Sequence, residues 1–198
     1  MKTMDVSDTL NHLLPVPLEQ SYRLMNHGPT VLVSAEHAGQ ANLMAAAWAC
    51  VLDFGTHPKV TVVLDKATVT RGLIEASGAF ALQLPTVAQA PMVTAVGSVS
   101  ARDLPDKAAR HGVDWFRPPG VSTPLVAGCV GWLACRLRPE PHNQQVYDLF
   151  IGDVVGAWAD RRVFQNGRWV FEQAPDAMRT IHHVAGGHYR VTGDPLQT

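Results

Sequence analysis

The sequence predicts a single, mainly β domain whose short strands close into a barrel, with a few short helices outside it. Runs rich in β-branched residues recur at short spacing, and Gly, Pro and Asn-Gly signals separate them. The apolar patterns at helical spacing between these runs are short. The motifs G-x-G-x-x-G and G-x-x-x-x-G-K-[ST] do not occur. A barrel is therefore favoured over a doubly wound sheet.

The composition is that of an ordinary globular domain. Of 198 residues, 46% are hydrophobic and 17% are charged, and the formal net charge is −1, so no basic footprint for nucleic acid is present. No apolar run approaches the roughly 18 residues of a membrane span, and the first residues lack the apolar core of a signal peptide. We therefore expect a cytoplasmic protein with neither a nucleic-acid nor a membrane partner.

The first strands are expected after an N-terminal arm. Residues 1–20 show little periodicity and form this arm, which leaves 21–198 as the folded domain. Residues 30–35 are a short β-rich run. The stretch 43–52 is uniformly apolar and small, which is typical of a strand buried on both faces. Residues 60–64 form the next strand.

Two short helices flank the following strand. A one-sided apolar pattern predicts a helix over about 70–76, and Ser77-Gly78 is its stop signal. Residues 79–84 form a strand that Pro85 ends. A second helix is expected from Thr86 to about Val96.

The second half is β in character after a loop-rich section over 103–124. Residues 129–138 and 146–157 are two long β-rich runs, and the turn residues 139–144 between them predict a hairpin. Asn166-Gly167 is a further hairpin turn signal.

The cysteines and histidines do not indicate a metal site. Cys50, Cys129 and Cys135 show no C-x-x-C spacing, so we interpret them as small buried hydrophobes. His182 and His183 are adjacent on a predicted strand and point to opposite faces, so they do not bind one metal together.

One short segment has the residue types that a flat aromatic ligand needs. An amide side chain can hydrogen-bond the edge of such a ligand, small side chains let backbone amides approach its ring, and an indole can form a wall. The alternative is a turn-ending Asn, a tightly packed strand and a core Trp. These residues are Asn42, Met44, Ala45, Ala46, Ala47 and Trp48.

A cluster of phosphate-compatible residues precedes the first predicted helix. Lys66, Thr68, Thr70 and Arg71 lie where hydroxyls, amides and positive charge complement a dianion. The alternative is a Thr that caps the helix beside two solvated cations. Further along, Lys107 lies in a polar stretch that is either a surface loop or a second source of positive charge.

The order of these segments resembles the flavin reductase-like family of FMN-binding split barrels. No single motif is highly specific, but the ordered set is, and it covers roughly residues 20–192. The matching patterns are N-x-M-x-x-x-W at 42–48, T-x-x-L-I at 70–74, Ser-Gly-Ala-Phe at 77–80, Leu-Phe-Ile-Gly-Asp-Val at 149–154 and Gly-Gly-His-Tyr at 186–189.

The resemblance implies a six-stranded split barrel that forms a homodimer with one FMN per subunit. It implies hydride transfer from NADH or NADPH to flavin. The reduced flavin then passes electrons to a flavin-dependent monooxygenase or to another electron acceptor. A flavoredoxin-type electron carrier and a non-catalytic flavin-binding module remain alternatives. No catalytic residue is assigned. The flavin-contacting positions carried over are Asn42, Met44, Ala45, Ala46, Ala47, Trp48, Asp65, Lys66, Thr68, Thr70 and Lys107.

Two departures from the family pattern bear on the chemistry. Ala45, Ala46 and Ala47 stand where relatives often have small hydroxyl residues, so hydrogen bonds to the ring have to come from the backbone. Asp148 stands where many relatives have a His. A carboxylate there would repel a reduced, anionic flavin. Lys107, if it lies near the flavin N1 and O2 edge, would instead stabilise that anion.

Overall fold

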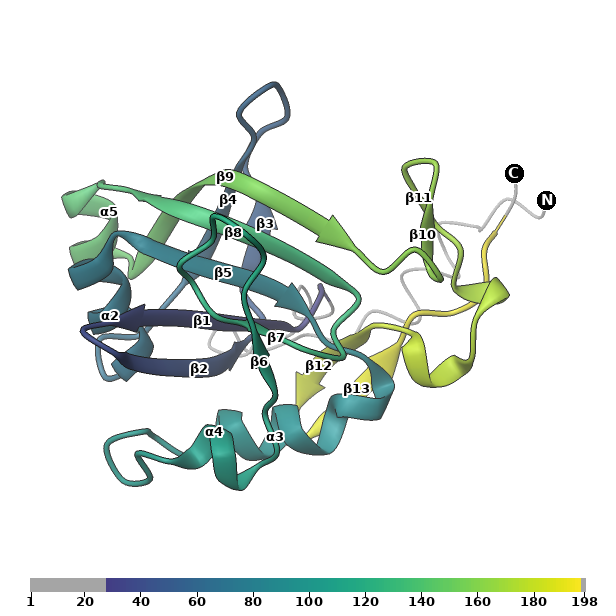
Figure 1. Cartoon of the computed structure of the whole chain (residues 1–198), viewed down its shortest axis with the longest axis horizontal. Helices are drawn as coiled ribbons and strands as arrows, with labels where there is room; N and C mark the ends of the chain where they lie inside the picture. The colour runs from purple at the N-terminus through teal and green to yellow at the C-terminus, as the bar shows by residue number, and fades with distance from the viewer. Residues whose placement is uncertain (1–27, 197–198) are drawn as a thin grey trace, which may run out of the picture.

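A curved antiparallel sheet forms the centre of the computed structural model, which describes residues 28–196 (Figure 1). Its strand order is β2-β1-β5-β8-β9-β4-β3. Only Ala47 and Trp48 separate β2 from β3, although these two segments lie at opposite ends of that order, so the sheet returns on itself as a barrel. The strands are β1 (Val31–His37), β2 (Gln40–Ala46), β3 (Ala49–Val51), β4 (Lys59–Val63), β5 (Ala79–Leu84), β8 (Gly131–Arg138) and β9 (Leu149–Ala159).

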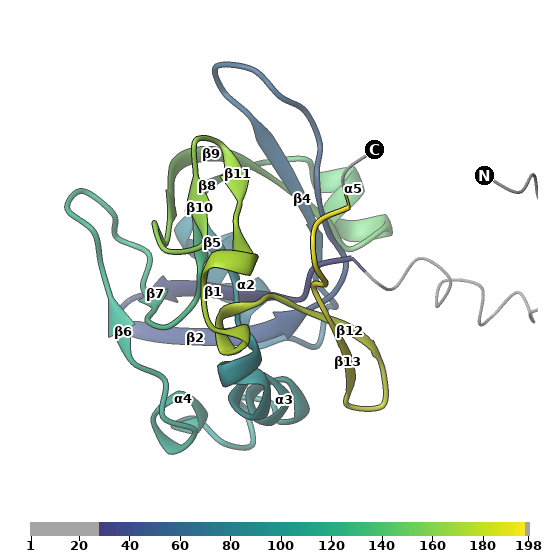
Figure 2. The ribbon, with the colours of Figure 1, turned by 90° about the vertical axis from the view of Figure 1, so that its right-hand side faces the viewer.

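With β2 and β3 counted as one interrupted strand, the barrel has the six strands that were predicted. The helices and small hairpins lie outside it, with α3 and α4 below β1 and β2 and the β12–β13 hairpin beside α3 (Figure 2). No helix in the described residues is long and apolar enough to span a bilayer. The outer elements are α2 (Val69–Ser77), η2 (Val87–Gln89), α3 (Ala90–Ser98), α4 (Lys107–Arg110), β6 (Trp115–Phe116), β7 (Leu125–Val126), α5 (Pro141–Val146), β10 (Phe164–Gln165), β11 (Arg168–Trp169), η3 (Phe171–Gln173), η4 (Asp176–Met178), β12 (Ile181–Ala185) and β13 (His188–Val191).

Strand β1 is buried on both faces and joins the two main cores. Its alternate residues Val31 and Val33 pack in the barrel interior, while Leu32 packs on the outside against Val93 and Val96 of α3. Burial of a side chain of this size contributes about 1.5–3 kcal/mol. Leu32 and its neighbour Leu43 of β2, which belong to the same outer core as Val93 and Val96, therefore hold α3 against the outside of the barrel.

The local signals located most elements. The predicted strand at 79–84 coincides with β5, and Asn166-Gly167, both with positive φ, forms the turn between β10 and β11. The predicted turn at 139–144 is wrong, because Pro141 begins the short helix α5. The N-terminal arm predicted over residues 1–20 lies outside the described residues.

The expectation that residues 43–52 form a strand buried on both faces is wrong. The strand breaks after Ala46, and the segment that follows leaves the core. Val51 is 68% exposed, and Phe54 in the loop after β3 is 96% exposed. An apolar pattern does not distinguish residues of the chain's own core from exposed apolar residues, so the sequence could not show that this segment is exposed.

The cysteines divide into two environments. Cys129 and Cys135 are buried as predicted, whereas Cys50 is exposed, which corrects the expectation for that residue. Burial raises the pKa of the Cys129 and Cys135 thiols to about 12.

Cys50→Ser is therefore expected to leave no thiol that reacts with Ellman's reagent at pH 8 in the folded protein, because the thiolate is the reactive form. Two thiols per chain should react once the variant is unfolded in guanidinium chloride, since both remaining cysteines are then exposed. Rapid reaction of either thiol before unfolding would contradict the buried placement.

Candidate functional site

Three adjoining cavities surround the C-terminal half of β2, and Ala45 lines all of them. The helix cavity, of 350 Å³, lies between the start of α2 and the end of α3. The strand cavity, of 380 Å³, lies along Met44–Trp48 and the end of β4. The hairpin cavity, of 200 Å³, lies between α3 and the β12–β13 hairpin. Together they form one cleft, of a size typical of cofactor sites.

Asn42 and Thr70 meet in the wall of the helix cavity, as Asn42 Nδ2 donates a hydrogen bond of 3.0 Å to Thr70 Oγ1. Both residues are buried. The hydroxyl proton of Thr70 has no acceptor among the described residues, so this group can still donate to a ligand. The amide of Asn42 thus orients a hydroxyl whose donor capacity is left for the cavity.

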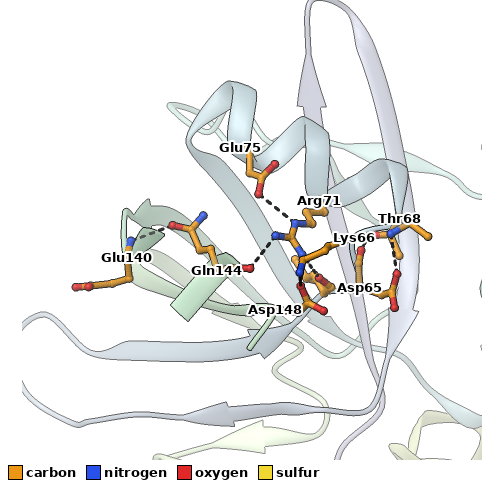
Figure 3. A network of polar contacts seen from close by, with 10 residues as sticks. Asp65, Lys66, Thr68, Arg71, Glu75, Glu140, Gln144 and Asp148 are labelled. Atoms are coloured by element: carbon orange, nitrogen blue, oxygen red, sulfur yellow. Dashed lines mark hydrogen bonds and ion pairs between the residues drawn. The ribbon is translucent and has the colours of Figure 1, made fainter. Parts of the chain in front are cut away.

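The start of α2 leaves its first backbone amides without a side-chain cap. Thr68 is the N-cap residue, but its hydroxyl donates to the carbonyl of Asp65 at 2.8 Å and does not cap the helix. The Asp65 carboxylate accepts a 2.6 Å hydrogen bond from the amide of Ala67 and tightens the same turn (Figure 3). The positive end of the helix dipole therefore faces the helix cavity, where it favours an anion.

The guanidinium of Arg71 is engaged in a network of protein contacts, so its predicted contact with a phosphate stays a prediction that these contacts do not favour (Figure 3). Its guanidinium donates to the Asp148 carboxylate at 2.5 Å, to the carbonyls of Leu64 at 3.0 Å and Gln144 at 2.7 Å, and to Glu75 at 3.1 Å. Burial opposes its charge, but the hydrogen bonds to Asp148 and Glu75 outweigh burial and raise the pKa of Arg71. Arg71 therefore joins the start of α2 to the segment between α5 and β9.

Lys66 and Asp148 lie side by side at the edge of this network (Figure 3). Lys66 is exposed, with its Nζ 3.9 Å from Asp148 Oδ1, and it lines a separate pocket on the outer side of α2 with Arg102. Asp148 has a positive φ of 54° and lines the strand cavity. Because Arg71 neutralises this carboxylate, its repulsion of an anion in the cavity is reduced.

Lys107 is buried at the far wall of the helix cavity. Its Nζ donates hydrogen bonds of 2.9 Å to the carbonyls of Val96 and Val99, at the C-terminal end of α3. Burial lowers the pKa of this ammonium group. No carboxylate within residues 28–196 pairs with it, so its charge is balanced only by helix carbonyls and raises the potential in the cavity.

The floor of the cleft is flat because its side chains are small. Ala45, Ala46 and Ala47 line the strand and hairpin cavities, and Trp48 lies at the edge of the strand cavity. A Cβ atom at Gly97 would lie 3.1 Å from the Ala45 Cβ, which shows how closely α3 approaches β2. The floor thus offers backbone groups to a planar ligand, and every predicted contact position except Lys66 lines the helix or strand cavity.

Two aromatic residues of the site were not identified from the sequence as ligand contacts. His183 lines both the strand and the hairpin cavities, and Tyr189 lines the hairpin cavity. The sequence showed a histidine pair on a strand and the Gly-Gly-His-Tyr pattern, but neither indicates that this hairpin packs beside α3. Among the described residues no group of three His, Cys, Asp or Glu side chains is placed to hold a metal.

The barrel, its interrupted strand β2–β3 and the cleft outside it define the split-barrel fold of FMN-binding proteins. The chain belongs to the flavin reductase like domain family, whose model matches residues 22–177.

Three relatives illustrate the range of similarity. The uncharacterized protein YddH of Escherichia coli K12 is 42% identical over 187 residues, which cover 93% of this chain and 97% of that protein. The crystal structure of an FMN-binding domain of a flavin reductases-like enzyme from Shewanella baltica is 53% identical, with a TM-score of 0.85 over 92% of this chain and 95% of that one. The flavoredoxin of Desulfovibrio vulgaris, at 24% identity, shares the fold with a TM-score of 0.73 over 86% of this chain and 90% of that one.

Proposed function

We propose that this protein binds FMN in the cleft and is a flavin reductase that oxidises NADH or NADPH. The observation that carries the proposal is the pairing of an uncapped helix start and a donor hydroxyl at one end of the cleft with a floor of alanines at the other. A phosphate fits the first end and a flat ring fits the second. The family membership and the FMN-binding relative at 53% identity support the same ligand.

When bound, FMN supplies the two-electron acceptor between NAD(P)H and a second acceptor. The residues of this chain bind and orient that cofactor. The α2 amides and the Thr70 hydroxyl would hold the phosphate, backbone groups of Ala45–Ala47 would contact the ring, and Lys107 would raise the local potential. Hydride transfer to the flavin does not require an acid or base from the protein. We further propose that reduced flavin passes to free FMN, to a partner monooxygenase or to another acceptor.

The visible spectrum of the purified protein under anaerobic conditions tests this function. A yellow protein that bleaches on addition of NADH or NADPH is the expected result. A yellow protein that bleaches only with dithionite is a flavoredoxin-type carrier without its own NAD(P)H site. A protein that takes up no flavin from a stoichiometric FMN solution would contradict the proposal.

Thr70→Ala is expected to weaken FMN binding about 5- to 10-fold, because one hydrogen bond of about 1–1.5 kcal/mol to the phosphate is lost. Riboflavin affinity should stay nearly unchanged, since riboflavin has no phosphate. Fluorescence titration measures both constants. Thr70→Ser keeps the hydroxyl and should restore FMN affinity, and Thr68→Ala should have little effect because that hydroxyl donates to Asp65. Equal weakening of FMN and riboflavin would show that Thr70 does not contact phosphate.

We also propose that the protein is a homodimer, with the exposed apolar surface around β3 in the interface. Val51 and Phe54 belong to this surface, and a groove of 550 Å³ beside them is lined mainly by apolar side chains of β3, β5, β8 and β9. Because β3 follows directly on Trp48, the interface would adjoin the cleft.

Light scattering at micromolar concentration should therefore give about twice 21.4 kDa. Val51→Asp should shift the mass toward the monomer, because it places a charge in an apolar contact. His37→Asp, exposed at the end of β1, is a matched control that should stay dimeric. A parent protein of monomer mass would contradict the dimer.

A further inference from the structure

We propose that the hairpin cavity is a subsite for a neutral primary carboxamide, with His183 as the hydrogen-bond donor to its oxygen and Tyr189 as the acceptor of its N–H. This inference rests on the proposed function, because the carboxamide in question is that of the nicotinamide ring of NADH or NADPH.

The position of the cavity suits a second planar ligand beside the flavin site. The hairpin cavity shares Ala45, Ala46, Ala47 and His183 with the strand cavity, so a group in one is in contact with the walls of the other. Its volume of 200 Å³ accommodates a single small ring rather than a second flavin. The cleft thus has adjoining spaces for two rings along the same strand.

The direction of the hydrogen bonds leaves Tyr189 as an acceptor. Thr94 Oγ1 donates its only proton to the carbonyl of Ala90 at 3.0 Å. The 3.0 Å contact between Thr94 Oγ1 and the Tyr189 hydroxyl is therefore one in which Tyr189 donates. With its proton committed to Thr94, the phenol oxygen presents only lone pairs to the cavity.

The imidazole of His183 is the complementary donor. Its backbone amide donates to Thr30 Oγ1 at 2.7 Å, and its ring lies edge-on to Tyr189 with a centroid distance of 5.4 Å, so the ring is held in place. Within the described chain no hydrogen bond engages either ring nitrogen. A neutral imidazole carries one N–H, which can donate to a carbonyl oxygen in the cavity.

A primary carboxamide matches this pair, and a carboxylate does not. The amide offers one carbonyl acceptor and an NH₂ donor, which suit His183 and Tyr189 respectively. A carboxylate has only acceptor oxygens, and one of them would face the lone pairs of the Tyr189 hydroxyl. The site should therefore discriminate between nicotinamide and nicotinic acid dinucleotides of the same size.

Calorimetric titration of the FMN-loaded protein tests the subsite without turnover. The first probe is 1,4,5,6-tetrahydronicotinamide adenine dinucleotide, which does not reduce flavin. The second is the same dinucleotide with a carboxylate in place of the carboxamide. We expect the parent to bind the carboxamide about 10-fold more tightly, since one satisfied hydrogen bond contributes about 1–1.5 kcal/mol. Tyr189→Phe and His183→Ala should each reduce carboxamide affinity about 5- to 10-fold and bring the ratio between the two probes toward one.

The controls separate local binding from folding. His183→Gln keeps an N–H donor and should retain part of the preference, and His188→Ala, exposed on the same hairpin, should behave as the parent. FMN affinity should stay within about twofold in Tyr189→Phe and His188→Ala, because Tyr189 lines the hairpin cavity alone and His188 lines none of the three cavities.

The outcomes also separate this inference from the proposed function. If the parent bleaches with NADH but the variants keep its preference for the carboxamide, the subsite is wrong and the reductase proposal stands. Equal weakening of both probes would likewise overturn the assignment of His183 and Tyr189. A parent that binds FMN but neither bleaches with NADH or NADPH nor binds the dinucleotide probe would overturn both.

Discussion

Arg71→Ala is expected to lower the free energy of unfolding by about 3 kcal/mol, the largest loss we expect from a single polar side chain in this protein. The substitution removes the guanidinium from Asp148, Glu75 and two backbone carbonyls at once. Breaking a buried ion pair costs about 3–5 kcal/mol. The lower end applies here because the Asp148 side chain is 28% exposed.

Urea unfolding followed by circular dichroism measures this loss, which corresponds to a melting temperature lower by about 6–12 °C in a chain of this size. The matched control is Arg110→Ala, which removes an exposed ion pair with Asp106 on α4 and should cost less than about 1 kcal/mol. Equal effects of the two substitutions would show that the Arg71 network contributes no more than a surface pair.

Ligand binding distinguishes the two roles that Arg71 can have. If it positions the start of α2, as its contacts indicate, Arg71→Ala should weaken FMN and riboflavin by similar factors, because the whole turn from Asp65 to Thr70 shifts. If Arg71 instead binds the phosphate, Arg71→Ala should weaken the binding of FMN alone, because riboflavin has no phosphate. The comparison therefore tests directly the role that the sequence had suggested for this residue.

The difference between these roles shows what the sequence could reveal. An arginine at the start of a helix has the same residue type and spacing whether it binds a phosphate or a carboxylate. Its partner Asp148 lies 77 positions away, so local sequence contained no sign of the pair. The same limit applies to Asn42 and Thr70, which were predicted separately and are joined by a hydrogen bond across 28 positions.

Local sequence signals correctly predicted where an element ends when that end depends on residues nearby in the chain. Pro85 ends β5, and Gly78, with a φ of 71°, ends α2 as predicted. They were insufficient where an element packs against a distant one, as the β12–β13 hairpin does beside α3. The contribution of Tyr189 to the cleft is of this kind. The exposed surface of β3 was missed because an apolar residue such as Val51 has the same pattern in a core and in an interface.

Ala45→Leu is expected to weaken FMN binding by about 30- to 100-fold while the protein still folds. Ala45 lines all three cavities, and α3 approaches it so closely that a Cβ on Gly97 would lie 3.1 Å from its Cβ atom. Added carbons there overlap with any ligand that spans the cleft, and overpacking of this kind costs about 1–3 kcal/mol, near its upper end for a rigid ring. Ala45 is only partly buried, so the fold tolerates the larger side chain better than the ligand does.

The matched control for this substitution is Ala41→Leu, on the same strand and also partly buried but outside the three cavities. It should bind FMN as the parent does, and circular dichroism should show the same fold for both variants. Riboflavin should also lose affinity for Ala45→Leu, because the added side chain blocks the floor under the ring that both ligands share, in contrast to Thr70→Ala. If Ala45→Leu binds FMN normally while Ala41→Leu does not, the ligand lies elsewhere on the barrel and the cleft is not the flavin site.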